Sequence, residues 1–194
     1  VDLPLLKNIW TERGTPSKNE VFVHPVERAG KSVANKLTDI RAKMKELGST
    51  AHVIASLDDV AWTLNLRGSD VESNPVFLGY IFITETQAVL FVDQDKLTEE
   101  SVQQLATSGV DVQDYDAFYS YLQSVNGQKV LVSANTNQAI FEALKTQNTF
   151  VVAPVPGNLM KAQKNAAELE GFRIVMERDG VAMVNFLHWL THQA

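Results

Sequence analysis

The sequence predicts an α/β domain in which helices flank a mixed sheet. Short apolar runs of strand length alternate with segments whose apolar residues recur at helical spacing. Two early apolar runs, 76–83 and 88–92, are joined by the polar residues 84–87 and predict a hairpin, whereas helices separate the later strands. A hairpin combined with helical crossovers gives a mixed sheet rather than a purely parallel one.

Composition indicates a globular protein with an ordinary core. The chain has 194 residues, of which 45% are hydrophobic, enough for one domain or for one domain with an appendage. Its net charge is −6, from 17 basic and 23 acidic residues, so it offers no basic surface for phosphate. We therefore expect neither nucleic acid nor an anionic membrane as a partner.

Cysteine is absent, which excludes disulfides, thiolate metal sites and a cysteine nucleophile. This composition suits a reducing cytosol, and we expect a cytoplasmic protein. No apolar run reaches the roughly 18–20 residues that a bilayer requires, and we expect no signal peptide in these residues.

Residues 1–30 are expected to form a connector arm rather than a domain. A short apolar run ends at Trp10, and the chain then becomes polar with Gly14 and Pro16 before it reaches Pro25. Trp10 is expected to pack on the body of the domain, with a solvent-facing binding tryptophan as the alternative.

The first helix is predicted at 32–47. Its apolar residues are spaced by three and four, Ser32 can cap its first turn, and Gly48 follows as a left-handed terminator. A strand at 51–55 comes next. Ser56 and Asp59 then have the spacing of a capping serine and an acidic residue at the start of a helix over 57–64.

The remaining elements alternate regularly. Helices are predicted near 98–106, 114–124 and 137–145, and strands at 110–112, 129–133 and 149–153. The 114–124 helix carries an aromatic stripe that we assign to the core rather than to a ligand platform. The stripe consists of Tyr115, Phe118, Tyr119 and Leu122.

The last segment changes character. Asn165 and Glu168 predict the start of a long helix, and beyond Gly180 that helix is apolar on nearly every face. A helix of this kind is expected to be buried by other parts of a protein on all sides. Because the chain also lacks a starting methionine, we expect a piece of a larger protein. The alternative is that the helix packs into a groove of the domain or onto a dimer mate.

The segment 65–77 is the most informative loop. It joins the 57–64 helix to the hairpin, and Gly68 and Pro75 interrupt it. A cation, a carboxylate and small polar side chains lie between them, a composition typical of loops that present functional groups.

Catalytic machinery is not evident. His188 and His192 have the i, i+4 spacing of a zinc pair but no third ligand, so polar positions near a helix end are the preferred interpretation. Asp58 and Asp59 are assigned to helix stabilisation, and the turn with Asp93 and Asp95 suggests a cation only weakly. Neither a phosphate loop nor a nucleophile elbow is present. We therefore expect no catalytic residue and no metal ligand in this chain.

Several motifs resemble the middle domain of the three-domain Xaa-Pro aminopeptidases (aminopeptidase P). The central motif is 58–70 followed by Asn74, Pro75, Val76, Phe77 and Tyr80. Three further motifs are similar to the same family. The connector out of its first domain resembles 9–10 and 23–25, and its opening helix resembles 29–32, 36–37 and 40–41. The passage into its catalytic domain resembles Lys161, Ala162, Lys164, Asn165, Glu168, 178–182, 186–187 and 189–190.

This resemblance implies a fold and a division of the chain. It implies a ribonuclease H-like creatinase/prolidase N-terminal domain at 31–160, preceded by the arm 1–30 from a first domain. A helix at 161–194 would lead into a metallopeptidase domain.

The resemblance also implies an activity for the parent protein. That protein would release an N-terminal residue preceding proline from a peptide, using two divalent ions, typically manganese, in its catalytic domain. The present chain would hold no cofactor, contact its own first and catalytic domains, and help to fix a homo-oligomer. The alternative is a self-contained, non-enzymatic interaction module on the same fold.

By the same resemblance, Arg67, Asp70 and Asn74 line the substrate channel. The competing interpretation is structural, with Arg67 and Asp70 bonding each other and the loop backbone. Glu72 and Ser73 depart from the family, which commonly has Pro-Tyr there, so the shape of the channel at that point is open.

Overall fold

The computed structural model describes residues 9, 12, 14–15 and 17–193. The prediction for Trp10 lies outside these residues.

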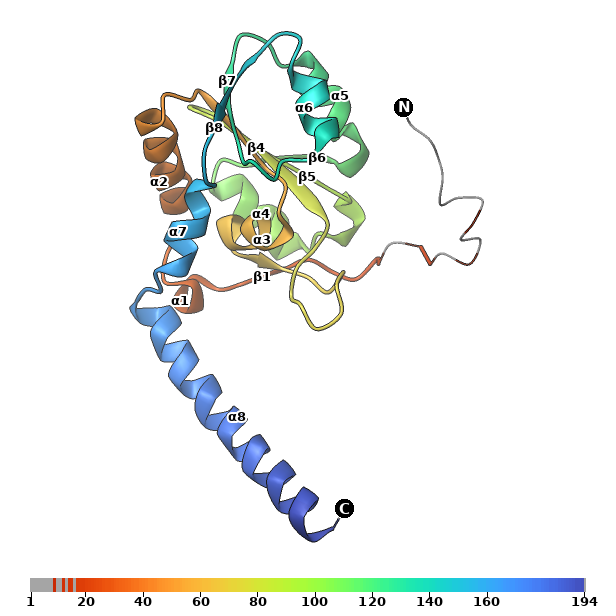
Figure 1. Cartoon of the computed structure of the whole chain (residues 1–194), viewed down its shortest axis with the longest axis vertical. Coiled ribbons are helices and arrows are strands. Elements are labelled where there is room, and N and C mark those ends of the chain that lie inside the picture. Colours follow the sequence, from red (N-terminus) through yellow and green to blue (C-terminus); the bar gives the residue numbers. More distant parts are fainter. Residues whose placement is uncertain (1–8, 10–11, 13, 16, 194) are drawn as a thin grey trace.

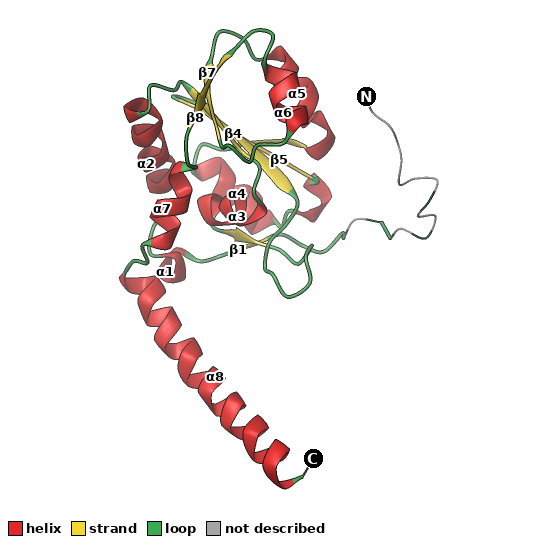
Figure 2. Ribbon diagram, viewed as in Figure 1, coloured by secondary structure: helices red, strands yellow, loops and turns green. Residues whose placement is uncertain are grey.

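A six-stranded mixed sheet forms the centre of the molecule (Figure 2). Its strands, in spatial order, are β6 (Asp111–Asp114), β5 (Ala88–Val92), β4 (Gly79–Thr84), β2 (Ala51–Ile54), β7 (Lys129–Val132) and β8 (Thr149–Val152). β4 pairs antiparallel with both β5 and β2, and the other pairs are parallel. The predicted hairpin and mixed sheet are therefore confirmed.

Helices cover both faces of this sheet (Figure 1). One face packs against α2 (Val33–Glu46), α3 (Leu57–Leu64), α4 (Glu99–Thr107) and α7 (Pro156–Ala162). The other face packs against α5 (Phe118–Ser124) and α6 (Gln138–Leu144). Two 3₁₀ turns, η1 (Gln94–Lys96) and η2 (Tyr115–Ala117), follow β5 and β6. The sequence prediction missed α7, and η2 takes the first turn of the helix predicted at 114–124.

The strands alternate their side chains between two cores. Along β4, Ile81 and Ile83 join the cluster under α2 and α3, whereas Phe82 joins the cluster under α5 and α6. Of the predicted aromatic stripe, Phe118 and Leu122 are fully buried, while Tyr119 is 37% exposed. The core assignment thus holds for the inward side of α5 only.

A second, two-stranded sheet ties the arm to the domain. β1 (Phe22–Val23) pairs antiparallel with β3 (Leu66–Arg67), and α1 (Val26–Ala29) follows it. Val21, just before β1, is completely buried. The described part of the arm is therefore joined to the start of the 65–77 loop.

The helix caps agree with prediction in two cases and differ in one. Ser32 accepts a hydrogen bond from Asn35 N at 3.3 Å, and Asn165 and Glu168 form a complete capping box. Ser56 is the N-cap residue of α3, as predicted, but the capping hydrogen bond is absent, because its hydroxyl donates to the Asp59 carboxylate instead of accepting from the backbone. Lys161 of α7 pairs with the same carboxylate, so Asp59 holds α3 to α7.

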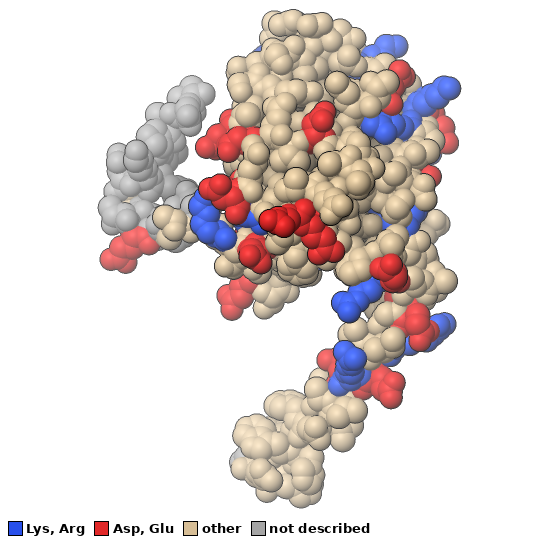
Figure 3. Space-filling model, turned by 180° about the vertical axis from the view of Figure 1, so that it is seen from behind, with Lys and Arg blue, Asp and Glu red and all other residues tan. Residues whose placement is uncertain are grey.

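The long helix α8 (Ala166–His192) extends away from the sheet (Figure 1). Every residue from 171 to 193 is exposed. The lower end of the helix carries no Lys, Arg, Asp or Glu beyond Asp179, which Figure 3 shows as an uncharged tip. The helix does not pack into a groove of its own domain, contrary to one of the two alternatives drawn from the sequence.

Candidate functional site

The loop 65–77 begins with a residue in an uncommon backbone conformation. Asn65 ends α3 with φ of 50°, in the left-handed region, and its carbonyl accepts from His24 N at 2.7 Å. The chain then forms β3 against the arm, which directs the loop out of the domain. A Cβ at Gly68 would lie 2.8 Å from Phe77 Cβ, so the outgoing and returning halves of the loop can approach closely because position 68 is glycine.

The tip of the loop is a tight reversal. Val71 and Asn74 form an antiparallel bridge, and Asn74 N donates to Val71 O at 3.2 Å. Ser73 takes a left-handed φ of 60° at the turn. The whole segment from 71 to 75 is exposed, so Asn74 presents its side chain to solvent.

Asp70 lies inside the molecule rather than at the tip. Its side chain is 1% exposed, and its Oδ2 atom accepts from Leu78 N at 2.7 Å and from Lys96 Nζ. The backbone N of Asp70 donates to Val76 O at 3.1 Å. Asp70 therefore connects the outgoing and returning halves of the loop to each other and to η1.

Arg67 is half-buried where the loop leaves β3. Its Nη1 atom donates to Ala61 O at 3.0 Å and to Leu66 O at 2.9 Å. Burial lowers the pKa of this guanidinium, which nevertheless stays protonated near neutral pH. The group is thus a fixed positive charge that is partly accessible to solvent.

Two other titratable side chains, His24 and Lys36, lie in the neighbourhood of Arg67. Burial lowers the pKa of His24, and the charges of Arg67 and Lys36 lower it further. Burial also lowers the pKa of Lys36 to about 8. The Glu168 carboxylate at the start of α8 acts in the opposite direction on all three groups. The neighbourhood of Arg67 is therefore positively charged, with one carboxylate facing it.

The structure places the three predicted site residues in three different environments. Arg67 is half-buried, the Asp70 side chain is buried and Asn74 is exposed. The side-chain hydrogen bonds of Arg67 and Asp70 go to different partners, so the expected alternative of a direct Arg67–Asp70 bond is not what the described chain contains. The other part of that alternative, bonding to the loop backbone, is present for Arg67 at Leu66 O, while the Asp70 side chain bonds to Leu78 N, directly after the loop.

Lys96 was not singled out by the sequence, although it holds Asp70. No local signal marks it, because it lies in a polar stretch between β5 and α4. Lys36 belongs to one of the family motifs but carries no predicted role. Its position between Val33 and Ile40 on the apolar stripe of α2 would have indicated a buried lysine.

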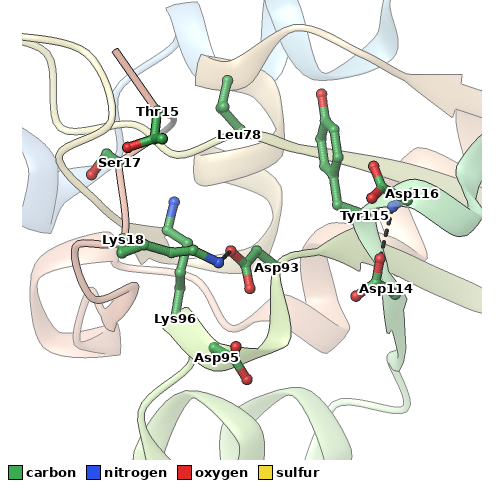
Figure 4. A pocket seen from close by; sticks show the side chains of 10 residues that line it. All are labelled: Thr15, Ser17, Lys18, Leu78, Asp93, Asp95, Lys96, Asp114, Tyr115 and Asp116. Carbon is green, nitrogen blue, oxygen red and sulfur yellow. Dashed lines mark hydrogen bonds and ion pairs between the residues drawn. The ribbon is translucent and has the colours of Figure 1, made fainter.

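A cavity of about 650 Å³ lies beside the loop, and Lys96 forms part of its wall (Figure 4). Its lining residues are Thr15, Ser17, Lys18, Leu78, Asp93, Asp95, Lys96, Asp114, Tyr115 and Asp116. Lys18 Nζ pairs with Asp93 Oδ2 at 2.5 Å; this hydrogen bond raises the pKa of Lys18 and lowers that of Asp93. An arm residue, Lys18, therefore occupies the side of the Asp93 carboxylate that faces the cavity.

Metal ligands do not gather in the described part of the chain. No group of three or more His, Cys, Asp or Glu side chains there could hold a metal ion. His188 and His192 stack with ring centroids 4.4 Å apart on the exposed end of α8. Across residues 17–193, the structure also contains no helix with the length and apolar character to cross a membrane.

The fold and the loop together define an α/β domain that presents a short, internally braced loop next to its central hairpin. The chain belongs to the creatinase/prolidase N-terminal domain family, which matches residues 12–168. The resemblance drawn from the loop motif is thereby confirmed.

Two curated relatives extend along nearly the whole chain. It is 36% identical over 201 residues to a probable Xaa-Pro aminopeptidase P of Sordaria macrospora, covering 97% of this chain and 33% of that protein. It is 32% identical over 216 residues to aminopeptidase P1 of Arabidopsis thaliana, covering 97% of this chain and 34% of that protein. The chain therefore spans about a third of the length of these relatives.

Solved structures agree with this assignment. An X-prolyl aminopeptidase of Caenorhabditis elegans, described as a cytosolic enzyme with a di-nuclear active site, matches with a TM-score of 0.90 and 32% identity, covering 98% of this chain and 32% of that one. An Xaa-Pro dipeptidase of Bacillus anthracis matches with a TM-score of 0.57 and 16% identity, covering 82% of this chain and 43% of that one, and shares the fold alone.

Proposed function

We propose that this chain is the noncatalytic middle domain of a metal-dependent aminopeptidase P, which removes an N-terminal residue preceding proline. The observation that carries the proposal is the match, at a TM-score of 0.90, to about a third of the C. elegans X-prolyl aminopeptidase. In this proposal residues 1–30 connect to a first domain, 31–160 form the middle domain and 161–194 lead into the catalytic domain.

The chemistry belongs to that catalytic domain. We assign it the two divalent ions, with manganese as the proposed metal, because the described residues here offer no ligand group. The C. elegans relative is described as having a di-nuclear site, which supports the assignment. The present chain contributes no cofactor of its own and no step of the reaction.

The loop 65–77 forms one wall of the substrate channel in this proposal. Arg67 supplies a fixed, partly accessible positive charge that can donate to a peptide carbonyl or carboxylate. Asn74 supplies an exposed amide at the tip. Asp70 serves the same wall from inside, since its buried carboxylate fixes the path of the loop.

The uncharged end of α8 is the surface that meets the catalytic domain. Its apolar side chains are about half exposed, from 48% at Trp189 to 65% at Val184, which is unusual for a helix in water. We further propose a cytoplasmic homo-oligomer. The description of the C. elegans enzyme as cytosolic supports the location.

Activity and metal content test the division of labour. The isolated chain should show no stoichiometric manganese by elemental analysis and no release of the first residue from an Xaa-Pro peptide, while the full-length protein should show both. Peptidase activity in the isolated chain would overturn the proposal. A full-length protein without activity would favour a non-enzymatic interaction module instead.

Arg67 provides the sharper test of the channel wall. In the full-length enzyme, Arg67→Ala should lower kcat/KM about tenfold with little change in Tm. The matched control is Arg41→Ala, which removes another half-buried arginine, one that donates to Thr84 O at 2.9 Å at the far end of β4. A large loss of Tm with unaltered kinetics for Arg67→Ala would refute the substrate role.

A further inference from the structure

Two buried lysines hold the loop 65–77 at two different residues. Lys36 on α2 is 2% exposed and Lys96 in η1 is 3% exposed; these are the buried lysines of the described chain. Lysine is rarely buried to this degree unless it is paired. Both of these lysines direct their ammonium groups to residues of the same loop.

Lys36 holds the start of the loop. Its Nζ atom donates to Asn65 Oδ1 and to Trp62 O, each at 2.7 Å, and lies 4.1 Å from the centre of the Trp62 ring. Asn65 Nδ2 in turn donates to Lys31 O at 2.9 Å. Asn65, the left-handed residue at the start of the loop, is thus held through both the oxygen and the nitrogen of its side-chain amide.

Lys96 holds the middle of the loop through Asp70. The two groups form an ion pair whose side chains are 3% and 1% exposed. Through its carbonyl, Lys96 also accepts from Val21 N of the arm at 2.7 Å. One residue therefore connects the loop, the 3₁₀ turn after β5 and the arm.

Stability alone is a poor explanation for this arrangement. Desolvating a lysine and an aspartate costs several kcal/mol, and apolar pairs of similar volume are often as stable or more stable. In addition, Asp70 Oδ1 is buried and receives no hydrogen bond from the described residues. The bonds of this pair are directional, and they connect Asp70 to Lys96 and to Leu78 N in one geometry.

Arg67 lies between the two anchors. The chain positions 65 and 70 are both fixed, and in the described chain the side chain of Arg67 donates through Nη1 only. A displacement of about 1 Å at such a group can cost up to about a hundredfold in rate. The chain on either side of Arg67 is thus bonded to one of the two lysines, although neither lysine contacts Arg67 by a hydrogen bond or an ion pair in the described structure.

We propose that Lys96 and Lys36 are positioning residues of the peptidase, which set the place of Arg67 against the peptide by acting through Asp70 and Asn65. This inference rests on the proposed function of the loop. It adds two residues, far from the loop in sequence, that determine how well the substrate is held.

The test uses the full-length enzyme and separates position from stability. Lys96→Met alone leaves a buried, unpaired carboxylate and is expected to lower Tm. Lys96→Met combined with Asp70→Asn removes both charges and keeps an acceptor for Leu78 N, so it should recover most of that Tm. The double variant should still raise KM about tenfold with kcat within about twofold, and Lys36→Met should do the same. The control is Lys145→Met, which removes an exposed lysine at the C-terminal end of α6 and should change neither kcat nor KM.

The outcomes distinguish the inference from the function beneath it. If Arg67→Ala lowers kcat/KM but the recovered double variant has wild-type KM, the proposed function stands and the positioning inference is overturned. If Arg67→Ala has no kinetic effect, both the proposed substrate role of the loop and the positioning inference are overturned. Adding Arg67→Ala to the double variant should cause little further loss, because the lysines act through Arg67; a fully additive loss would also overturn the inference.

Discussion

Acid should destabilise this domain through one buried histidine, His52. This residue lies on β2 in the middle of the sheet and is 0% exposed. Its Nδ1 atom lies 2.9 Å from Leu131 O, which can only accept, so Nδ1 carries the proton of the neutral ring. Its Nε2 atom is buried and has no hydrogen-bond partner among the described residues. A proton added at Nε2 would therefore have no acceptor.

The magnitude follows from the pKa of this ring. Burial lowers the pKa of His52 from 6.5 to about 4, against the smaller raising effects of the Leu131 carbonyl and the Asp59 charge. Between these two values the unfolded chain binds a proton that the folded chain does not, so the free energy of unfolding falls as pH falls from 6.5 toward 4. At about 1.36 kcal/mol per pH unit, the loss amounts to about 3 kcal/mol.

Urea unfolding, followed by tryptophan fluorescence at several pH values between 7 and 4, measures this loss. Carboxylates also titrate in this range, so the informative quantity is the difference between wild type and His52→Gln. The glutamine amide can donate to Leu131 O but does not titrate. We expect wild type to lose about 3 kcal/mol more than this variant between pH 7 and pH 4.

The control is His188→Gln, which removes an exposed histidine of α8. Its profile should follow that of wild type. Parallel profiles for wild type and His52→Gln, within about 0.5 kcal/mol, would refute the reasoning, because they would mean that the ring is protonated as easily in the folded chain as in the unfolded one.

Two further predictions concern the junction with α8 and its apolar end. Gly30→Ala should lower the free energy of unfolding by more than the control Gly48→Ala. Both glycines have a left-handed φ, 67° and 71°, so the backbone strain of an alanine is shared. Only at Gly30 would the added Cβ overlap another group, the Asn165 side chain, whereas Gly48 faces open space. Chemical denaturation measures the difference, and equal losses would contradict the contact. The exposed end of α8 should promote self-association of the isolated chain, and Phe186→Glu should reduce it more than Asn185→Glu, which adds the same charge without removing an apolar side chain. Sedimentation velocity over a range of concentrations decides this, and a wild-type chain that stays monomeric throughout would count against it.

Local signals predicted most of the secondary structure correctly. The capping serine and terminating glycine around α2 bounded that helix, and the capping box at Asn165 marked the start of α8. These signals act within one turn of the backbone, so they are visible in the sequence. The helix α7, in contrast, begins with Pro156 and continues with Gly157, residues that usually indicate a loop. It is held by packing on other helices, including Gly157 against Trp62.

The error at Ser56 has a similar cause. The spacing of Ser56 and Asp59 is that of a capping pair, and an isolated helix would use it in that way. In the folded domain Lys161 reaches the Asp59 carboxylate from a segment more than a hundred residues away, and the serine hydroxyl turns to the same carboxylate. A long-range ion pair has overridden a local preference.

The 65–77 loop shows the same limit at the candidate site. The sequence marked Arg67, Asp70 and Asn74 as polar residues of one loop, and nothing in their spacing distinguishes a residue that holds the loop from one that can contact a ligand. That distinction comes from burial, which depends on Lys36 and Lys96, 29 and 26 positions away from the residues they bind. A buried carboxylate facing a lysine cannot reach a peptide, whereas an exposed amide at the tip can. Only the folded structure therefore separates the polar residue that holds the loop from the one that is open to a ligand.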